Sequence, residues 1–159
     1  MSRAKMRDRS ELAAALDREP ALRRGLVLAN GLFDLIHVGH VRYLEGARAC
    51  GERLLVAVNS DASARRLKGP DRPYVPLDER MEIVAALGCV DWVLGFDEPN
   101  VEGLLRTLRP AIHAKGTDYT VDSVPERAVA RELGIETVVV GDTKDHATSD
   151  LARRVREGR

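Results

Sequence analysis

Apolar and polar positions follow two different periods along this chain. Five short runs are almost continuously apolar, as buried strands are, and they occupy residues 26–29, 54–58, 92–96, 111–114 and 137–140. Apolar residues instead recur every three to four positions, as on one face of a helix, at residues 38–49, 77–87, 100–108, 124–133 and 148–157. Strand and helix therefore alternate regularly, which predicts an α/β fold: a doubly wound domain with a five-stranded parallel sheet.

Residues 1–24 lie outside this alternation. Residues 1–9 are polar and basic, and we expect them to be frayed, while Ser10 begins a short helical pattern that ends near Asp17. A chain of 159 residues suits one domain with a sizeable core. Because no linker or repeat divides it, we expect a single domain over residues 1–159, with 1–24 as an N-terminal extension that carries a short helix.

Composition narrows the possible partners. The chain has 25 basic and 25 acidic residues and thus no formal net charge, so no overall field attracts it to nucleic acid. No apolar stretch approaches the roughly 20 residues that span a bilayer, and the basic start lacks the apolar segment of a signal peptide. We therefore expect a cytoplasmic protein without a membrane or nucleic-acid partner. Cys50 and Cys89 have no metal-ligand spacing, so we expect both to be reduced packing residues.

The stretch from Asn30 to His40 is the most informative in the sequence. It follows the first predicted strand and reads Asn-Gly-Leu-Phe-Asp-Leu-Ile-His-Val-Gly-His. His37 and His40 lie three apart on the first turn of a predicted helix, so they share one face. The N–H groups and positive dipole end of a helix favour anions, and Gly39 allows a polyphosphate to approach the backbone. Two histidines alone are more often surface or core residues, but the complete string favours phosphate chemistry.

Polar residues also end the second apolar run. Asn59, Ser60 and Asp61 could cap the following helix or bind a hydroxyl group of a substrate. Both interpretations stay open on the residues alone.

The basic stretch at residues 65–73 is broken by Gly69 and two prolines, which predicts a loop. Charge on a loop usually serves solvation. Four cations close to a triphosphate site could also neutralise charge in a transition state. We expect this role for Lys68, with Arg72 as a lesser candidate.

Three later stretches of the sequence contain further candidate site residues. Arg80 could pair with a neighbouring carboxylate at the surface, or its planar guanidinium could contact phosphate. Lys115 and Asp118 follow the fourth predicted strand in a Lys-Gly-Thr-Asp-Tyr turn. Thr148 and Ser149 begin the last predicted helix and are good N-caps on their chemistry alone.

Residues 30–40 resemble the G-x-F-D-x-x-H-x-G-H signature of the cytidylyltransferase-like nucleotidyltransferases, whose domains are Rossmann-like. Residues 57–63, 67–69 and 90–93 resemble one branch, the heptose 1-phosphate adenylyltransferases, which also occur as the C-terminal half of bifunctional heptose kinase/adenylyltransferases. The resemblance extends over roughly residues 24 to 156. It implies transfer of AMP from ATP to D-glycero-D-manno-heptose 1-phosphate. The products would be pyrophosphate and an ADP-heptose for bacterial surface polysaccharide such as lipopolysaccharide.

The resemblance also implies roles for individual residues. The groups that stabilise charge during catalysis would be His37, His40, Lys68 and Arg80. The nucleotide would lie against Asn30, Leu32, Phe33, His40, Lys115, Asp118, Thr148 and Ser149. The acceptor would lie against Asp34, Asn59, Asp61, Lys68 and Arg72. Magnesium would be held largely by ATP phosphates, with no protein metal site.

The end of the chain departs from the superfamily pattern. Ala147 stands where isoleucine or serine is usual, and Asp150 stands where a lysine or arginine is common. Arg153 or Arg154 could supply the missing cation. Because the superfamily commonly self-associates, we expect a homo-oligomer. Because no kinase sequence precedes the domain, we expect a separate sugar kinase to make the substrate.

Other functions fit the same motif. A related enzyme could use CTP with glycerol 3-phosphate or phosphoethanolamine, or ATP with phosphopantetheine. A catalytically silent sensor could keep the fold and only bind nucleotide. Both histidines and the basic stretch are present, so we expect an enzyme rather than a sensor.

Overall fold

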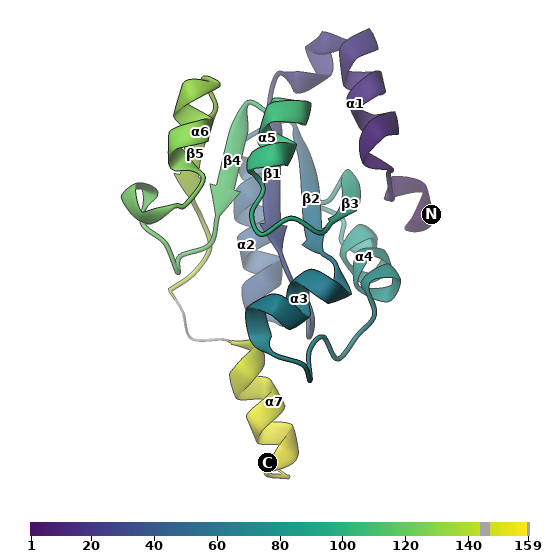
Figure 1. The fold of residues 1–159 in the computed structure, drawn as a ribbon, viewed down its shortest axis with the longest axis vertical. Coiled ribbons are helices and arrows are strands. Elements are labelled where there is room, and N and C mark those ends of the chain that lie inside the picture. Colours follow the sequence, from purple (N-terminus) through teal and green to yellow (C-terminus); the bar gives the residue numbers. More distant parts are fainter. Residues whose placement is uncertain (144–146, 159) are drawn as a thin grey trace.

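A parallel sheet of five strands forms the centre of the molecule (Figure 1). The computed structural model describes residues 1–143 and 147–158. The strands are β1 (Leu26–Gly31), β2 (Arg53–Asn59), β3 (Trp92–Phe96), β4 (Ile112–Lys115) and β5 (Glu136–Val139). They lie in the order β3-β2-β1-β4-β5, which confirms the predicted five-stranded parallel sheet. The order reverses between β1 and β4, and such a switch point is where these sheets bind ligands.

Helices cover both faces of the sheet, as the doubly wound arrangement requires. The described residues form α1 (Arg9–Arg18), α2 (Val38–Ala49), α3 (Asp61–Lys68), α4 (Leu77–Ala86), α5 (Glu102–Leu108), α6 (Arg127–Glu132) and α7 (Thr148–Arg156). Three short 3-10 turns lie at Arg3–Lys5, Pro20–Arg23 and Val121–Ser123. Figure 1 shows α5 in front of the sheet and α2 behind it. The predicted Rossmann-like fold class is confirmed, although α5 and α6 are shorter than predicted.

Alternate strand residues supply two separate cores, because successive side chains of a strand point to opposite faces. Leu28 and Leu55 pack with the apolar side chains of α1, α5 and α6. Val27 and Val56 pack on the other face with those of α2 and α4. Each strand places apolar side chains against at least one of these cores, β5 through the partly buried Val138, and polar residues end β2 and β4.

The N-terminal residues pack against the sheet, so the expectation that residues 1–9 fray is wrong. The Arg7 N–H donates to Val93 O at 2.8 Å, and Met6 pairs with Val93 in a parallel bridge. Arg3 forms an ion pair with Glu82 at 3.0 Å. The segment covers the edge of β3, whose unpaired backbone groups favour such pairing.

Residues 65–68 are helical, so the prediction of a loop over 65–73 is wrong for its first half. The Ser60 hydroxyl accepts the Ser63 N–H at 3.0 Å and caps the start of α3. Gly69 ends the helix at a φ of 104°, which other residues rarely adopt. The cations of the last turn interact favourably with the negative end of the helix dipole. They are Arg65, Arg66 and Lys68.

The two cysteines differ in their environment. Cys89 is half-buried and packs against the core beside α4, as expected. Cys50 is exposed at the end of α2, so the expectation that it is a packing residue is wrong. The C-cap position lies beyond the last turn that faces the sheet, which explains its exposure.

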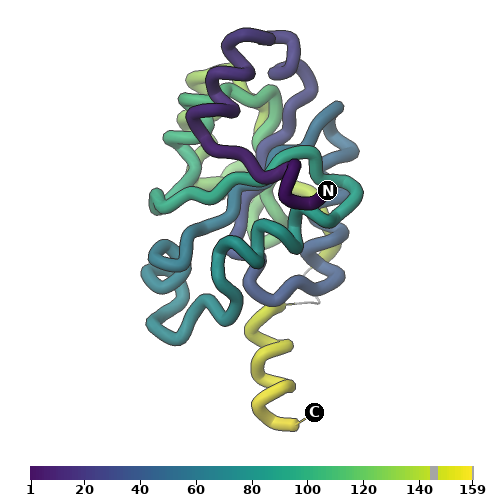
Figure 2. The backbone as a smooth tube through the Cα atoms, turned by 90° about the vertical axis from the view of Figure 1, so that its right-hand side faces the viewer, coloured from purple at the N-terminus to yellow at the C-terminus, as the bar shows by residue number. Residues whose placement is uncertain are grey.

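Helix α7 extends away from the rest of the molecule on the side of the carboxyl strand ends (Figure 2). No residue of α7 is buried among those the structure describes. Its first turn nevertheless reaches the β1–α2 connection, where the Thr148 hydroxyl donates to Leu35 O at 3.3 Å. The helix is therefore attached to the region of the histidine motif.

Candidate active site

The two motif histidines form the start of α2. His37 is the N-cap rather than a residue of the first turn, and its Nδ1 accepts the Gly39 N–H at 3.2 Å. His40 Nδ1 in turn accepts the His37 N–H at 3.3 Å. Their ring centroids are 4.0 Å apart. Because each Nδ1 accepts a hydrogen bond from a backbone N–H, a neutral ring carries its own proton on Nε2 and can donate a hydrogen bond from it to an anion.

His40 is neutral at physiological pH. Burial and, to a smaller extent, the neighbouring His37 lower its pKa to about 4. Its ring also contacts Phe33, with centroids 5.3 Å apart. A preorganised neutral donor of this kind can stabilise negative charge that develops in a transition state.

The backbone just before the histidines is strained. Phe33 has a φ of 51°, in the left-handed region that few residues other than glycine occupy. Its ring is buried and stacks on Tyr43, with centroids 6.5 Å apart. A Cβ atom at Gly31 would lie 3.1 Å from this ring, so a larger residue there would have to displace Phe33. Contacts from residues outside the motif stabilise this backbone conformation.

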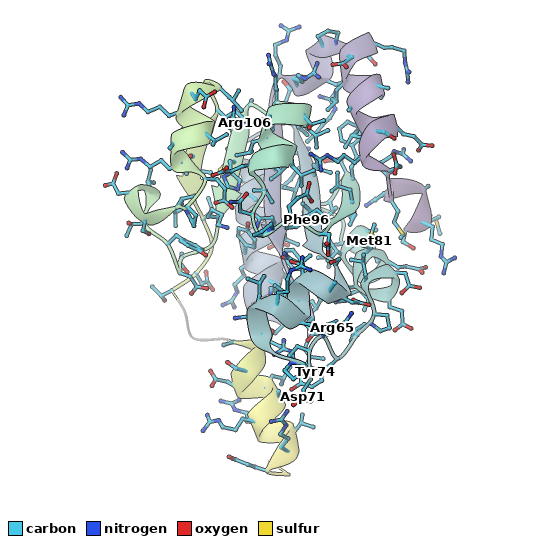
Figure 3. All side chains as sticks on the ribbon, in the orientation of Figure 1. Arg65, Asp71, Tyr74, Met81, Phe96 and Arg106 are labelled. Atoms are coloured by element: carbon cyan, nitrogen blue, oxygen red, sulfur yellow. The ribbon has the colours of Figure 1, made fainter. Side chains whose placement is uncertain are left out.

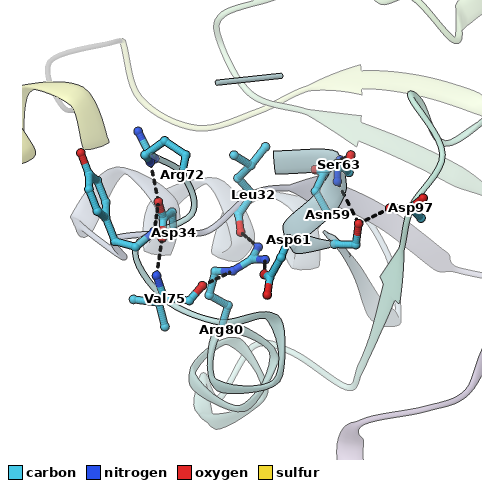
Figure 4. Close-up of polar contacts among 11 residues, drawn as sticks. Leu32, Asp34, Asn59, Asp61, Ser63, Arg72, Val75, Arg80 and Asp97 are labelled. Carbon is cyan, nitrogen blue, oxygen red and sulfur yellow. Dashed lines mark hydrogen bonds and ion pairs between the residues drawn. The ribbon is translucent and has the colours of Figure 1, made fainter. Parts of the chain in front are cut away.

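Arg80 supplies one of these contacts (Figure 4). Its guanidinium donates to Leu32 O at 2.6 Å, to Val75 O at 2.8 Å and to Asp61 Oδ1 at 2.7 Å. The side chain is 0 % exposed. Arg80 thus pairs with Asp61 and not with its neighbours on α4, and it fixes the position of the motif backbone. A direct phosphate contact by Arg80 stays a prediction.

Asp34 holds the loop that follows α3. One carboxylate oxygen accepts from Arg72 Nε at 2.7 Å, and the carboxylate also accepts the N–H groups of Tyr74 at 2.9 Å and Val75 at 3.0 Å. Asp34 is only 3 % exposed. The structure therefore shows Asp34 and Arg72 engaged with each other, and their predicted contact with an acceptor is not tested.

Asn59 and Lys68 stand at the two ends of α3. Asn59 is buried, and its amide donates to Ser63 Oγ at 3.0 Å. Lys68 is exposed in the last turn, immediately before Gly69. Of the two alternatives for the 59–61 stretch, the structure shows the helix cap, which Ser60 provides. Asp61 pairs with Arg80, and a contact with a substrate hydroxyl stays a prediction.

The start of α7 differs from the expectation. Ala147 is the N-cap and Thr148 the first helical residue, so neither Thr148 nor Ser149 caps the helix. The Thr148 hydroxyl is drawn instead to Leu35 O, a partner distant in sequence. Ser149 is exposed in the first turn. The residues Lys144, Asp145 and His146, which precede this turn, lie outside the described residues.

The remaining part of α7 faces the loop after α3. Arg156 donates to the Tyr74 hydroxyl at 2.9 Å, and Figure 3 shows Tyr74 and Asp71 beside this helix. Arg153 forms an ion pair with Asp150 at 3.6 Å, whereas Arg154 is exposed. Neither arginine is shown to replace the cation that the superfamily pattern has after Ser149.

The carboxyl end of β4 contributes a buried cation. Lys115 Nζ lies 4.0 Å from Glu126 Oε2 and 4.7 Å from the centre of the Tyr119 ring. Burial lowers the pKa of Lys115, and the Glu126 charge opposes that shift. Two positions before Lys115 in β4, His113 Nε2 lies 3.2 Å from Asn30 Oδ1 of the motif. Asp118 is exposed in the turn that follows.

The structure places the predicted residues in or after β1, β2 and β4, in α4 and at the start of α7, and their roles in binding and catalysis stay predictions. Sequence reasoning missed His113, Glu126 and Tyr74. A histidine inside the apolar run 111–114 was a usable signal for a buried polar contact. Nothing local marks Glu126, because its burial depends on Val101 and Lys115, which lie 25 and 11 positions away in the sequence.

The described residues hold no group of three His, Cys, Asp or Glu side chains placed to bind a metal ion. Asp34 and Asp61, the carboxylates nearest the motif backbone, are already paired with Arg72 and Arg80. Among the same residues, none of the helices has the length and apolar character that crossing a bilayer requires.

Comparison with known proteins places these features in a family. The cytidylyltransferase-like family model matches residues 28–154. The bifunctional protein HldE of Pseudomonas entomophila is 43 % identical over 147 residues, and that of Azotobacter vinelandii is 44 % identical over 146. Each alignment covers 92 % of this chain and 31 % of the relative, so the chain spans about a third of the length of these relatives.

Two solved structures share the fold. A lipopolysaccharide core biosynthesis protein from Thermoplasma volcanium has a TM-score of 0.65 and 27 % identity, over 76 % of this chain and 99 % of that one. Pantothenate synthetase from Thermus thermophilus has a TM-score of 0.61 at 18 % identity, over 89 % and 63 %, and supports the fold alone. With the paired histidines at the sheet edge, the family match over most of the chain shows that this protein belongs to the cytidylyltransferase-like family and is a nucleotidyltransferase.

Proposed function

We propose that this protein is a heptose 1-phosphate adenylyltransferase. The observation that carries the proposal is the His37–His40 pair at the start of α2, which offers donors to a triphosphate beside the strained Gly-x-Phe backbone. The heptose acceptor is supported by the resemblance of residues 57–69 to that branch, by the similarity to HldE, and by the similarity to a lipopolysaccharide core biosynthesis protein.

The reaction is an in-line displacement. An oxygen of the sugar 1-phosphate attacks the α-phosphorus of ATP, and the bond from that phosphorus to the oxygen bridging to the β-phosphorus breaks. Pyrophosphate leaves with the bond electrons, and ADP-heptose forms. No residue needs to act as a covalent nucleophile, because positioning and charge stabilisation account for most catalysis of phosphoryl transfer.

Each residue then has a specific task. His37 and His40 donate to the triphosphate as negative charge develops on the bridging oxygen. Lys115 and Lys68 approach the phosphates from β4 and α3, while Asn59 lines the acceptor side. Arg80 and Asp34 hold the motif backbone and the adjacent loop in place. Asp118, Thr148 and Ser149 remain nucleotide-binding proposals at the two turns that border this edge.

Magnesium would bind mainly through the phosphate oxygens of ATP. The available donor set fits this arrangement, because the nearby Asp34 and Asp61 carboxylates are occupied by arginines. Mg²⁺ keeps several waters and is commonly bound through substrate phosphates. When bound, it would neutralise charge on the triphosphate.

The proposal also places the protein in a sequence of reactions. A kinase that phosphorylates the anomeric hydroxyl of a heptose must supply the substrate. A glycosyltransferase that uses nucleotide-activated sugars must consume the product, toward bacterial lipopolysaccharide. We place these steps in the cytoplasm, where ATP is available.

Pyrophosphate release tests the proposal. The purified protein is mixed with Mg²⁺, with ATP, CTP or GTP, and with a panel of phosphate esters. We expect release with ATP and heptose 1-phosphate and none with glycerol 3-phosphate, because a site that pairs several hydroxyls rejects an acceptor that leaves them unpaired. Turnover of CTP with glycerol 3-phosphate would overturn the substrate assignment. No release with any pair would favour a silent nucleotide-binding module.

A further inference from the structure

Three buried polar side chains gather at β4, and we call them the β4 polar cluster: His113, Lys115 and Glu126. They are 0 %, 7 % and 2 % exposed. Burial of ionisable groups costs several kcal/mol each unless they compensate one another. The cluster lies at the switch point of the sheet, where β1 and β4 are neighbours.

Hydrogen bonding satisfies the β4 polar cluster only in part. Glu126 Oε1 accepts the Val101 N–H at 3.4 Å, but Oε2 lies 4.0 Å from Lys115 Nζ, which is beyond hydrogen-bond distance. His113 uses Nε2 toward Asn30 Oδ1 at 3.2 Å. Within residues 1–143 and 147–158, neither Glu126 Oε2 nor His113 Nδ1 has a hydrogen-bond partner. Charge, and not a hydrogen bond, therefore pairs Glu126 with Lys115.

We propose that Glu126 is a positioning residue for the nucleotide site. It keeps the Lys115 ammonium at the carboxyl end of β4 by charge alone, which leaves the N–H donors of Lys115 for the phosphates of the nucleotide. The inference rests on the proposed function, since Lys115 is one of the nucleotide-binding residues proposed there.

The surroundings of Lys115 show why the carboxylate is needed. Glu126 is the carboxylate that the structure records beside the Lys115 ammonium, whose other recorded neighbours are the Tyr119 ring at 4.7 Å and the buried His113, held neutral by a pKa of about 4. Burial already lowers the pKa of Lys115. Without the Glu126 charge the ammonium would lose its proton or turn away from β4. In either case the site loses a placed cation.

The variant Glu126→Gln tests this inference. It keeps the size of the side chain and an oxygen acceptor for the Val101 N–H, and removes only the charge. We expect its affinity for ATP, measured by calorimetry without acceptor, to fall about tenfold, within the range for coupled neighbours. Glu132→Gln is the matched control on the same helix, because Glu132 is exposed and pairs with Arg106. We expect it to bind ATP as the wild type does.

A double variant separates positioning from a general structural effect. We expect Lys115→Met/Glu126→Gln to bind ATP no more weakly than Lys115→Met alone, because Glu126 acts through Lys115. If the double variant lost ATP affinity by the product of the two single losses, the inference would be overturned. Unchanged ATP binding by Glu126→Gln would also overturn it. If Glu126→Gln does not fold, the variant Glu126→Asp tests the inference instead by its ATP affinity. It retains the charge, so affinity within about threefold of wild type supports the inference and a tenfold loss contradicts it.

A failure of the proposed function would give a different result from a failure of this inference. If the wild-type protein binds none of ATP, CTP and GTP, the nucleotide site itself is wrong and the inference falls with it. If the wild type binds ATP and Glu126→Gln binds it equally well, only the inference is overturned.

Discussion

The charged residues at this edge of the sheet fall into two groups. Some direct their hydrogen bonds to other groups of the protein, and others make few such bonds. Arg80 directs three donors to protein oxygens, and Asp34 accepts three contacts from one loop. These side chains shape the motif backbone. His40 and Lys68 are less engaged by the fold, so their removal should affect chemistry more than stability.

We expect His40→Ala to lower turnover by about 100-fold or more without unfolding the protein, since removal of one preorganised donor costs roughly 10² to 10³. Pyrophosphate release at saturating substrate gives the turnover, and circular dichroism verifies the fold. Near-normal turnover by a folded His40→Ala protein would contradict the catalytic role of His40.

Arg80→Met should instead destabilise the fold, by about 3 kcal/mol or more, because it leaves the buried carbonyls of Leu32 and Val75 and the carboxylate of Asp61 without their partner. Urea denaturation measures the free energy of unfolding. Arg106→Met is the control, since the Arg106–Glu132 pair is exposed and screened by solvent, so its loss should change the free energy of unfolding little. Equal losses in the two variants would show that the Arg80 network contributes little.

Among the elements, α3 and the loop after it behave as one unit. Capping by Ser60 starts the helix and Gly69 ends it. Asp34 then ties residues 72–75 to the β1–α2 connection. Lys68 is the last residue of the helix, and we expect rotation at the following Gly69 to move its ammonium relative to the histidines.

Lys68→Ala should therefore slow the chemical step more than it weakens nucleotide binding without acceptor. A cation at the end of a movable segment acts mainly after the substrates are in place. Single-turnover kinetics and ATP affinity measure the two effects. Arg65→Ala removes another exposed cation of α3 and should leave both values unchanged. Equal losses in ATP affinity and in kcat/KM would contradict this prediction, because they would show that Lys68 stabilises bound ATP and the transition state equally.

At the scale of the whole molecule, the two buried histidines link stability to pH. Burial lowers the pKa of both His40 and His113 to about 4 in the folded protein, while an unfolded histidine titrates near its ordinary value of about 6.5. Between these values the unfolded chain binds protons that the folded chain does not. Stability is therefore complete above about pH 6.5 and falls as the pH approaches 4.

We expect the urea midpoint of the wild type to be lower at pH 5 than at pH 7, and the difference to be smaller in His40→Gln/His113→Gln. Each variant is compared with itself at the two pH values, which removes its intrinsic loss of stability. An unchanged difference in the double variant would assign the pH dependence to other groups.

The sequence by itself determined the strands, most helices and the histidine motif. Short apolar runs and helical periods depend on neighbouring residues, and so do the Gly-x-Phe and His-x-Gly-His spacings. The α/β class and the family follow from such local patterns.

Only the tertiary structure decided which polar groups serve each other. Arg80 lies 48 positions from Leu32, and Tyr74 lies 40 positions from Asp34. The partner of Thr148 and the burial of Glu126 likewise depend on contacts between distant segments. A buried charge is stabilised only by a partner that the fold brings close to it. Because that partner can lie far away in the sequence, the neighbouring residues do not identify it.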